Sequence, residues 1–174
     1  IAGAGLAFEG FHMFAGSQNL RHAAIVEAQS KCYEQALEWQ DLLPAPIRSL
    51  NLGGGFGIPY SPGEAALDAS PVTDNLAQLS DRLVRDLPGA HIVIELGRYL
   101  VGEAGIFVAR VIDRKLSRGQ VFLVVDGGMH HHLAASGNFG QVIRRNYPVS
   151  VNGRRGEREV ANVVGPLCTP LDLL

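Results

Sequence analysis

The first hundred residues alternate between short apolar stretches and longer amphipathic segments. Apolar stretches at Gly10 to Ala15, Ile47 to Leu52 and Ile92 to Ile94 predict buried strands. The segments between them repeat hydrophobic residues every three or four positions, which predicts helices with one packed face. Strands and helices that alternate in this way form a parallel sheet covered by helices, so the pattern predicts the α/β class.

Two long helices are expected from this pattern. The first is expected to run from a cap at Asn19 to about Leu43, before Pro44 and Pro46. Its expected buried stripe is Ile25, Ala28, Cys32, Ala36, Trp39 and Leu43. The second is expected to begin at Ser70-Pro71, where the missing N–H of proline costs little. Its expected stripe is Val72, Leu76, Leu79, Leu83 and Leu87, and Pro88-Gly89 is expected to end it.

After about residue 103 the pattern changes to short β-branched and aromatic stretches. Ile106 to Ile112 and Val121 to Val125, joined by a polar turn around Ser117-Arg118-Gly119, predict a β-hairpin. Further extended pieces are expected at Pro148 to Val151 and Arg158 to Val164. We therefore expect two domains, an α/β domain at residues 1–104 and a β-domain at residues 105–174.

Length, charge and cysteine content exclude several classes of protein. The 174 residues include 15 Lys+Arg and 17 Asp+Glu, so no overall positive charge favours nucleic acid or an anionic membrane. The apolar runs are far shorter than the roughly 20 residues of a membrane-spanning helix. Cys32 and Cys168 provide no disulfide framework and suit a reducing cytoplasm. The chain is too short for a complete eight-stranded α/β barrel of about 250 residues, and its apolar ends indicate a fragment.

Candidate functional residues follow the predicted strands, where parallel α/β sheets bind their ligands. Gly53-Gly54-Gly55 can bring backbone N–H groups close to an anion, and Ser17 could donate a further hydrogen bond. The glycine spacing matches neither the dinucleotide fingerprint nor the Gly-Lys-Ser phosphate loop. By themselves, the glycines could also serve only to turn the chain.

Glu95 ends an apolar strand, and Arg98 follows it closely. A carboxylate at such a place requires a cation or a proton donor nearby. Arg98 could supply that partner; alternatively, Arg98 could bind a phosphate while Glu95 binds a protonated heterocycle. Three loops with anion donors, together with one acid, form a more specific combination than any single motif.

Three consecutive histidines, His130 to His132, do not predict a metal site. Neighbouring side chains on a strand or helix diverge, and no accompanying Cys or spaced His completes a ligand set. We expect these histidines to be exposed or hydrogen-bonded. Arg144-Arg145 and Arg154-Arg155 are expected to be solvated charges or a surface for an acidic partner.

Five segments stand in the order and at the spacing of one known family. They are Gly10 to Gln18 (GFHMFAGSQ), Leu50 to Gly57 (LNLGGGFG), Glu95 to Tyr99 (ELGRY), Val125 to Met129 (VDGGM) and Gly165 to Cys168 (GPLC). The chain resembles the alanine-racemase-like pyridoxal-phosphate decarboxylases, the group of ornithine and diaminopimelate decarboxylases. Its segment from Asp126 to Pro148 is most similar to a subgroup that acts in carrier-protein-linked or exopolysaccharide-associated pathways.

The resemblance implies a (β/α)₈ barrel followed by a β-domain, in a homodimer with shared active sites. Residues 1–104 would be the last strands of the barrel, and residues 105–174 the first part of the β-domain. The implied cofactor is pyridoxal 5'-phosphate, and the implied reaction is decarboxylation of an amino acid or of a carrier-bound aminoacyl substrate. A racemase of the same fold and a non-catalytic regulator, similar to the antizyme inhibitors, are the alternatives.

The resemblance also implies roles for individual residues. The residues that would surround the cofactor phosphate are Ser17, Gly53, Gly54, Gly55, Gly97 and Arg98. Glu95 would bind the pyridine nitrogen, and Phe14 would stack on the ring where the family usually has His; the role of His12 stays open. Cys168 would reach the partner subunit's site and help to protonate the carbanion left by decarboxylation, unless it is a buried structural cysteine.

Two departures from the family pattern bear on activity and substrate. The Schiff-base lysine is absent, because Lys31 and Lys115 stand in the wrong context, so we expect it before this chain begins and expect the chain alone to be inactive. Thr169 stands where decarboxylases of basic amino acids have Asp or Glu to bind a distal ammonium. Together with Arg144-Arg145 nearby in sequence, this threonine argues against a diamine-forming substrate.

Overall fold

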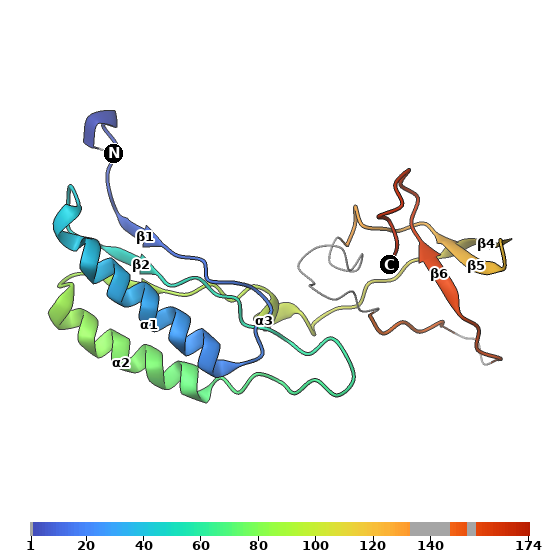
Figure 1. Ribbon diagram of the computed structural model, residues 1–174, viewed down its shortest axis with the longest axis horizontal. Coiled ribbons are helices and arrows are strands. Elements are labelled where there is room, and N and C mark those ends of the chain that lie inside the picture. Colours follow the sequence, from blue (N-terminus) through green and yellow to red (C-terminus); the bar gives the residue numbers. More distant parts are fainter. Residues whose placement is uncertain (1, 133–146, 153–155) are drawn as a thin grey trace. The chain divides into compact units, whose positions relative to one another are not determined.

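The computed structural model describes residues 2–132, 147–152 and 156–174, which form two compact units. One unit comprises Ile1–Pro59 and Gly63–Ala104, and the other comprises Tyr60–Pro62 and Gly105–Leu174. Each unit has its own three-stranded sheet, and Figure 1 labels the elements of both.

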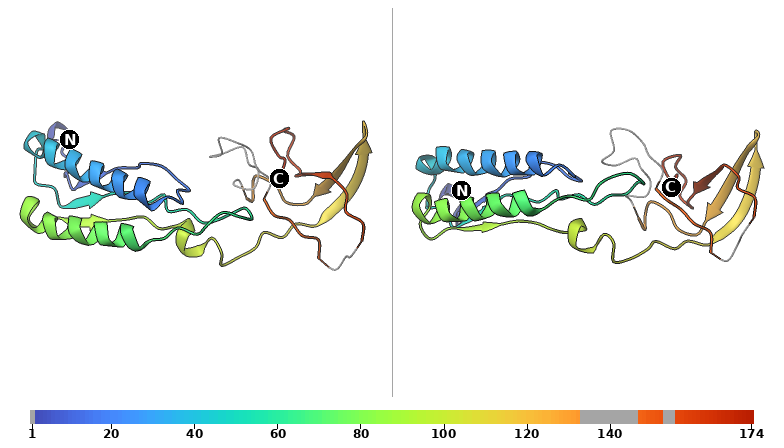
Figure 2. Two further views of the ribbon diagram at one scale, coloured as in Figure 1. Left: turned by 60° about the horizontal axis from the view of Figure 1, so that its bottom comes forward. Right: turned by 90° about the horizontal axis from the view of Figure 1, so that it is seen from below.

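The first unit is built on a parallel sheet with the strand order β1-β2-β3. The strands are β1 (Gly10–His12), β2 (Ser49–Asn51) and β3 (His91–Val93). Helices α1 (His22–Trp39) and α2 (Ser70–Asp86) connect consecutive strands and lie side by side (Figures 1 and 2). The α/β class predicted from the alternating pattern is confirmed, although β1 and β2 are shorter than their apolar stretches and β3 begins and ends one residue earlier than its stretch.

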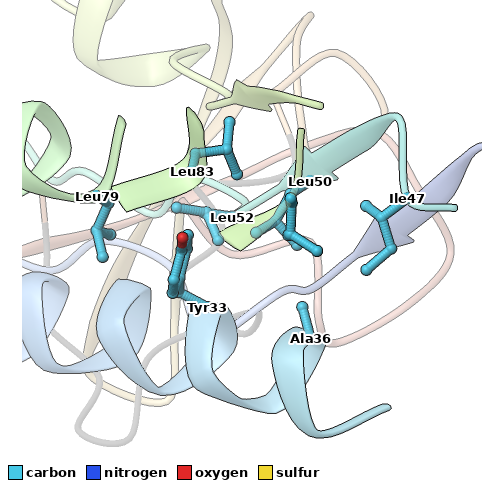
Figure 3. Close-up of a cluster of buried hydrophobic side chains, with 8 residues drawn as sticks. Tyr33, Ala36, Ile47, Leu50, Leu52, Leu79 and Leu83 are labelled. Atoms are coloured by element: carbon cyan, nitrogen blue, oxygen red, sulfur yellow. The ribbon is translucent and has the colours of Figure 1, made fainter. Parts of the chain in front are cut away.

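The core of this unit lies between the sheet and the two helices (Figure 3). It contains Tyr33, Ala36, Ile47, Leu50, Leu52, Leu79, Leu83 and Leu87, all buried. Leu50 is fully buried, and its register partners Phe11 and Ile92 pack against the same cluster. Because side chains alternate along a strand, the neighbouring pair His12 and Asn51 projects to the opposite face of the sheet.

Helix α2 agrees with its prediction. It begins at Ser70 with Pro71 in its first turn, and it buries Val72, Leu79 and Leu83. The short helix α3 (Arg98–Val101) follows β3 and was not predicted.

Helix α1 differs from its prediction at both ends. Its N-cap is Arg21 rather than Asn19, because Asn19 pairs with Phe56 in an isolated parallel bridge. The α-helix ends at Trp39, and a 3₁₀ turn over Gln40–Leu42 carries the chain on to the prolines.

The predicted buried face of α1 was also wrong in part. The buried residues are Ile25, Gln29, Tyr33 and Ala36, whereas Cys32 is only partly buried and Trp39 is 40% exposed. Polar side chains can occupy this face because α2 supplies their partners: Gln29 Oε1 accepts from Asn75 at 3.0 Å. Aliphatic spacing alone does not reveal these partners.

Tyr33 makes the stability of this unit sensitive to alkaline pH. Its side chain is fully buried, and Tyr33 Oη donates to Asp86 Oδ2 at 3.0 Å. Burial, followed by the hydrogen bond to the Asp86 carboxylate, raises the pKa of Tyr33 to about 12. The unfolded chain loses this proton near pH 10, so the contribution of the neutral hydroxyl is complete below about pH 10 and is lost as the pH rises through about 12.

We therefore expect the full-length protein to lose about 2 to 3 kcal/mol of unfolding free energy between pH 10 and pH 12 through this residue. Urea denaturation at a series of pH values measures the loss, and Tyr33→Phe should lack this part of the pH dependence. An identical pH dependence in the variant would contradict the assignment.

The second unit has a sheet with the strand order β4-β5-β6. Strands β4 (Val111–Ser117) and β5 (Gln120–Val125) form an antiparallel hairpin, and β6 (Ala161–Val164) lies parallel to β5. Arg118 and Gly119 at the turn both have positive φ, 50° and 76°, as a type I′ turn requires.

The hairpin was predicted, but its first strand was misplaced at 106–112. The two-residue turn pairs Ser117 with Gln120, and this register places β4 directly before the turn although its sequence is polar. Residues 148–151 form no regular strand, contrary to expectation. The predicted features at Arg144-Arg145 and Arg154-Arg155, and residues 133–146 of the segment from Asp126 to Pro148, lie outside the described residues.

Candidate functional site

The loops that follow the three parallel strands meet at one edge of the first sheet. Asn19 N donates to Gly55 O at 2.8 Å, and Glu95 N donates to Gly53 O at 2.8 Å. The glycine loop is therefore bonded to the loop after β1 on one side and to the loop after β3 on the other. This arrangement brings together the loops that carry Ser17, the three glycines, Glu95 and Arg98.

The close approach of these loops depends on the absence of side chains in the glycine loop. A Cβ on Gly54 would lie 1.8 Å from Glu95 O, and a Cβ on Gly55 would lie 2.2 Å from Gly16 O. Gly55 also has a φ of +81°, which residues with a side chain rarely adopt. Gly97 differs from these glycines, because a Cβ there would have no described atom within 4 Å.

Two side chains from the neighbouring strands hold the Glu95 carboxylate. Asn51 Nδ2 donates to Glu95 Oε1 at 3.0 Å, and His12 Nε2 lies 3.3 Å from the same oxygen. Asn51 Oδ1 accepts from Gly53 N at 2.9 Å, which fixes the amide so that its NH₂ group faces Glu95. Both contacts engage Oε1, so Oε2 is the oxygen that a ligand could use.

Gln18 connects Arg98 to the loops after β1 and β2. Arg98 Nη1 donates to Gln18 Oε1 at 3.0 Å, and Ile58 N donates to the same oxygen at 3.3 Å. Gln18 Nε2 donates in turn to Ile58 O. Because Gln18 directly follows the exposed Ser17, these bonds hold a positive charge next to the Ser17 loop.

The edge therefore combines a group of hydrogen-bond donors suited to an anion with a separate carboxylate. Ser17, the glycine backbone and Arg98 provide hydrogen-bond donors and one positive charge, whereas Glu95 provides an acceptor and one negative charge. Phe14, in the loop after β1, exposes 66% of its surface. Such an arrangement can bind a flat ligand that carries an anionic group and, apart from it, a protonated nitrogen.

The sequence patterns do not single out Asn51 or Gln18 as site residues, and they leave the role of His12 open. Asn51 could have been recognised from the sequence, because His12 and Asn51 are polar residues at the ends of apolar strands. The parallel pairing aligns His12, Asn51 and Val93, and Glu95 follows Val93 by two positions, so all share one face. Gln18 had no comparable signal, since its partner Ile58 is 40 residues away.

The remaining predicted residues lie elsewhere in the chain. Cys168 is exposed and belongs to the second unit, so it is not a buried structural cysteine in this structure. Lys31 lies on α1, where Lys31 Nζ is 2.6 Å from Glu27 Oε1, and Lys115 lies on β4. Neither lysine lies in one of the strand-end loops of the first unit.

The histidine run shows ring contacts. The ring centroids of His130 and His131 are 3.8 Å apart, and the ring centroid of His132 lies 5.3 Å from that of Phe107. In the described part of the chain, no group of three His, Cys, Asp or Glu residues is arranged to hold a metal ion. No helix in that part has the length and hydrophobicity needed to cross a bilayer.

Comparison with known proteins gives consistent matches over nearly the whole chain. Residues 16–174 match the family model described as pyridoxal-dependent decarboxylase, C-terminal sheet domain. The chain is 40% identical over 175 residues to L-glutamyl-[BtrI acyl-carrier protein] decarboxylase of Niallia circulans, a match that covers 96% of this chain and 40% of that protein. It is 31% identical over 172 residues to diaminopimelate decarboxylase of Bacillus subtilis, covering 95% of this chain and 38% of the relative.

Solved structures agree with these matches. Diaminopimelate decarboxylase from Helicobacter pylori, complexed with L-lysine, superposes with a TM-score of 0.67 at 27% identity. That match covers 95% of this chain and 38% of the solved one. The chain thus spans about two fifths of the length of the curated relatives it matches.

Proposed function

The chain belongs to the family of pyridoxal-dependent decarboxylases, and from its strand-end site we propose that the full-length protein removes the α-carboxylate of an amino acid or carrier-bound aminoacyl substrate with pyridoxal 5'-phosphate. The observation that carries this proposal is the direct hydrogen bond between the glycine loop and the loop of Glu95. This pairing suits a ligand with a phosphate and a ring nitrogen at separate positions.

The residues at the sheet edge fit this cofactor. Ser17, the backbone of Gly54, Gly55 and Gly97, and Arg98 would hold its phosphate, while Phe14 would lie against its ring. Gly53 would contribute the shape of the loop, because its N–H donates to Asn51 Oδ1. Glu95 Oε2 would accept the N–H of the protonated ring nitrogen. When bound, pyridoxal phosphate supplies the electron sink for the carbanion that decarboxylation leaves.

Asn51 and His12 would influence cofactor binding through their contacts with Glu95. Donation from Asn51 Nδ2 to Oε1 orients the Glu95 carboxylate and leaves Oε2 for the ring nitrogen. An ionised Glu95 keeps the proton on the ring nitrogen. Because Asn51 is also bonded to Gly53 N, the phosphate cradle and the acid form one hydrogen-bonded assembly.

The Schiff-base lysine of the proposed enzyme would lie outside these 174 residues, since Lys31 is paired on α1 and Lys115 lies on β4. Residues 1–104 would be the last part of a (β/α)₈ barrel, and residues 105–174 would belong to the β-domain. In a homodimer, the exposed Cys168 would protonate the carbanion in the partner subunit's site.

We further propose that the substrate is an aminoacyl group attached to a carrier protein. Thr169 follows Cys168, and its neutral hydroxyl cannot pair with a distal ammonium as a carboxylate would. The relative named for a carrier-bound glutamyl substrate is 40% identical, against 31% for the B. subtilis diaminopimelate decarboxylase.

Spectroscopy and product analysis of the full-length protein test this function. With pyridoxal phosphate it should show a near-visible absorption band from the bound cofactor, and it should release carbon dioxide faster from a glutamyl-carrier protein than from free diaminopimelate or ornithine. Thr169→Asp should shift this preference toward the free diamino acids. A missing band would support the non-catalytic regulator, and release from free diamino acids alone would contradict the carrier-bound substrate.

A further inference from the structure

Asp172 is a buried carboxylate in the second unit that joins two loops. The residue is only 3% exposed. Its Oδ1 accepts from Met129 N at 2.7 Å, and its Oδ2 accepts from Leu167 N at 2.9 Å. These two charge-assisted bonds to the backbone compensate for the hydration that the carboxylate loses on burial.

Two glycines make room for this carboxylate. A Cβ on Gly128 would lie 2.4 Å from Asp172 Oδ1, and a Cβ on Gly165 would lie 2.2 Å from Asp172 Oδ2. Both glycines belong to motifs recognised in the sequence, at 125–129 and 165–168. The Asp172 side chain is therefore the point at which these two motifs meet.

The backbone of Asp172 makes two further hydrogen bonds that close the turn containing Cys168. Asp172 N donates to Thr169 O at 3.2 Å, and Gly165 N donates to Asp172 O at 3.0 Å. Asp172 is thus bonded to the residue before Cys168 through its side chain and to the residue after it through its backbone. Cys168 itself is exposed, so this closed turn displays the thiol at its surface.

We propose that Asp172 is a positioning residue that holds the turn at 165–172 against the loop at 127–129 and so fixes the direction in which the Cys168 thiol points. This inference rests on the proposed function for the role of Cys168 as proton donor. In that step the S–H bond of Cys168 breaks, a C–H bond forms at the α-carbon of the decarboxylated substrate, and the thiolate regains its proton from solvent.

Asp172→Asn in the full-length holoenzyme tests the proposal. The amide keeps the size of the side chain, but one of its two polar groups is a donor, so it cannot accept from both Leu167 N and Met129 N. Decarboxylation in D₂O by the wild type should give a product with one configuration at its monodeuterated α-carbon. The variant should give a mixture of configurations, with kcat lower by roughly tenfold to a hundredfold and KM within a few-fold.

Three comparisons make this test specific. Cys168→Ala should give the same mixture, and adding Asp172→Asn to it should cause no further loss, because both changes remove one positioned proton donor. Asp68→Asn neutralises an exposed carboxylate whose Oδ1 accepts from Ser70 N, and it should keep the wild-type configuration. If Asp172→Asn does not fold, Asp172→Glu, which keeps the charge and displaces the oxygens, should show smaller changes of the same kind.

A second measurement does not depend on activity. In Asp172→Asn, amide hydrogen exchange at Leu167 and Met129 should quicken, and the alkylation rate of Cys168 should change while that of the partly buried Cys32 stays constant. A single product configuration in the variant, or unchanged exchange and alkylation, would overturn the proposal. A wild-type enzyme that releases no carbon dioxide from any tested substrate would instead overturn the proposed function.

Discussion

Replacing Glu95 with glutamine in the full-length protein is expected to lower kcat by roughly two to four orders of magnitude. The neutral amide cannot keep a proton on the cofactor's ring nitrogen, whereas the carboxylate can. Asn51 can still donate to the oxygen of the new side chain, so the local network at the sheet edge should survive. Cofactor affinity should stay within about tenfold, because the phosphate cradle supplies most of the charge-assisted bonds.

Steady-state turnover and an absorbance titration with pyridoxal phosphate measure these two effects separately. Glu27→Gln is the matched control, because Glu27 is an exposed carboxylate on α1 whose contact with Lys31 is screened by solvent and contributes little to stability. It should leave turnover and affinity at wild-type values. Unchanged turnover in Glu95→Gln would remove Glu95 from its assigned role, and a complete loss of cofactor binding would show that the acid, rather than the glycine loop, captures the cofactor.

Gly54→Ala should have the second large effect. The new Cβ would lie 1.8 Å from Glu95 O and 2.9 Å from Glu95 C, both backbone atoms, so the loop that carries Glu95 must move. A displacement of about 1 Å at a catalytic group costs on the order of a hundredfold in rate. Because the glycine loop moves as well, cofactor affinity should fall together with kcat, which distinguishes this variant from Glu95→Gln.

Gly3→Ala provides the control for this substitution, since a Cβ at Gly3 would have no described atom within 4 Å. Thermal unfolding of both variants should accompany the kinetics, so that a loss of fold is separated from a loss of site geometry. Wild-type affinity and turnover in a folded Gly54→Ala protein would mean that the close contact between the glycine loop and Glu95 is not needed.

Features that depend on neighbours in sequence could be predicted. The stripe of Val72, Leu79 and Leu83 on α2 follows from helical periodicity, and the turn at Arg118-Gly119 follows from the turn-forming residues just before the apolar strand β5. The buried face of α1 could not be predicted in the same way. Tyr33 can be buried there because its hydroxyl donates a hydrogen bond to Asp86, 53 residues later, and no local pattern records such a partner.

The sequence by itself determined which residues stand at the functional edge. Ser17, the three glycines, Glu95 and Arg98 all follow apolar strands, and the carboxyl ends of parallel strands must share one edge of their sheet. Only the tertiary structure decided how these residues are connected. Asn51 reaches Glu95 across 44 residues, Gln18 reaches Arg98 across 80, and Asp172 reaches Met129 across 43. Such contacts depend on strand register and side-chain direction, which the spacing of residues along the chain does not specify.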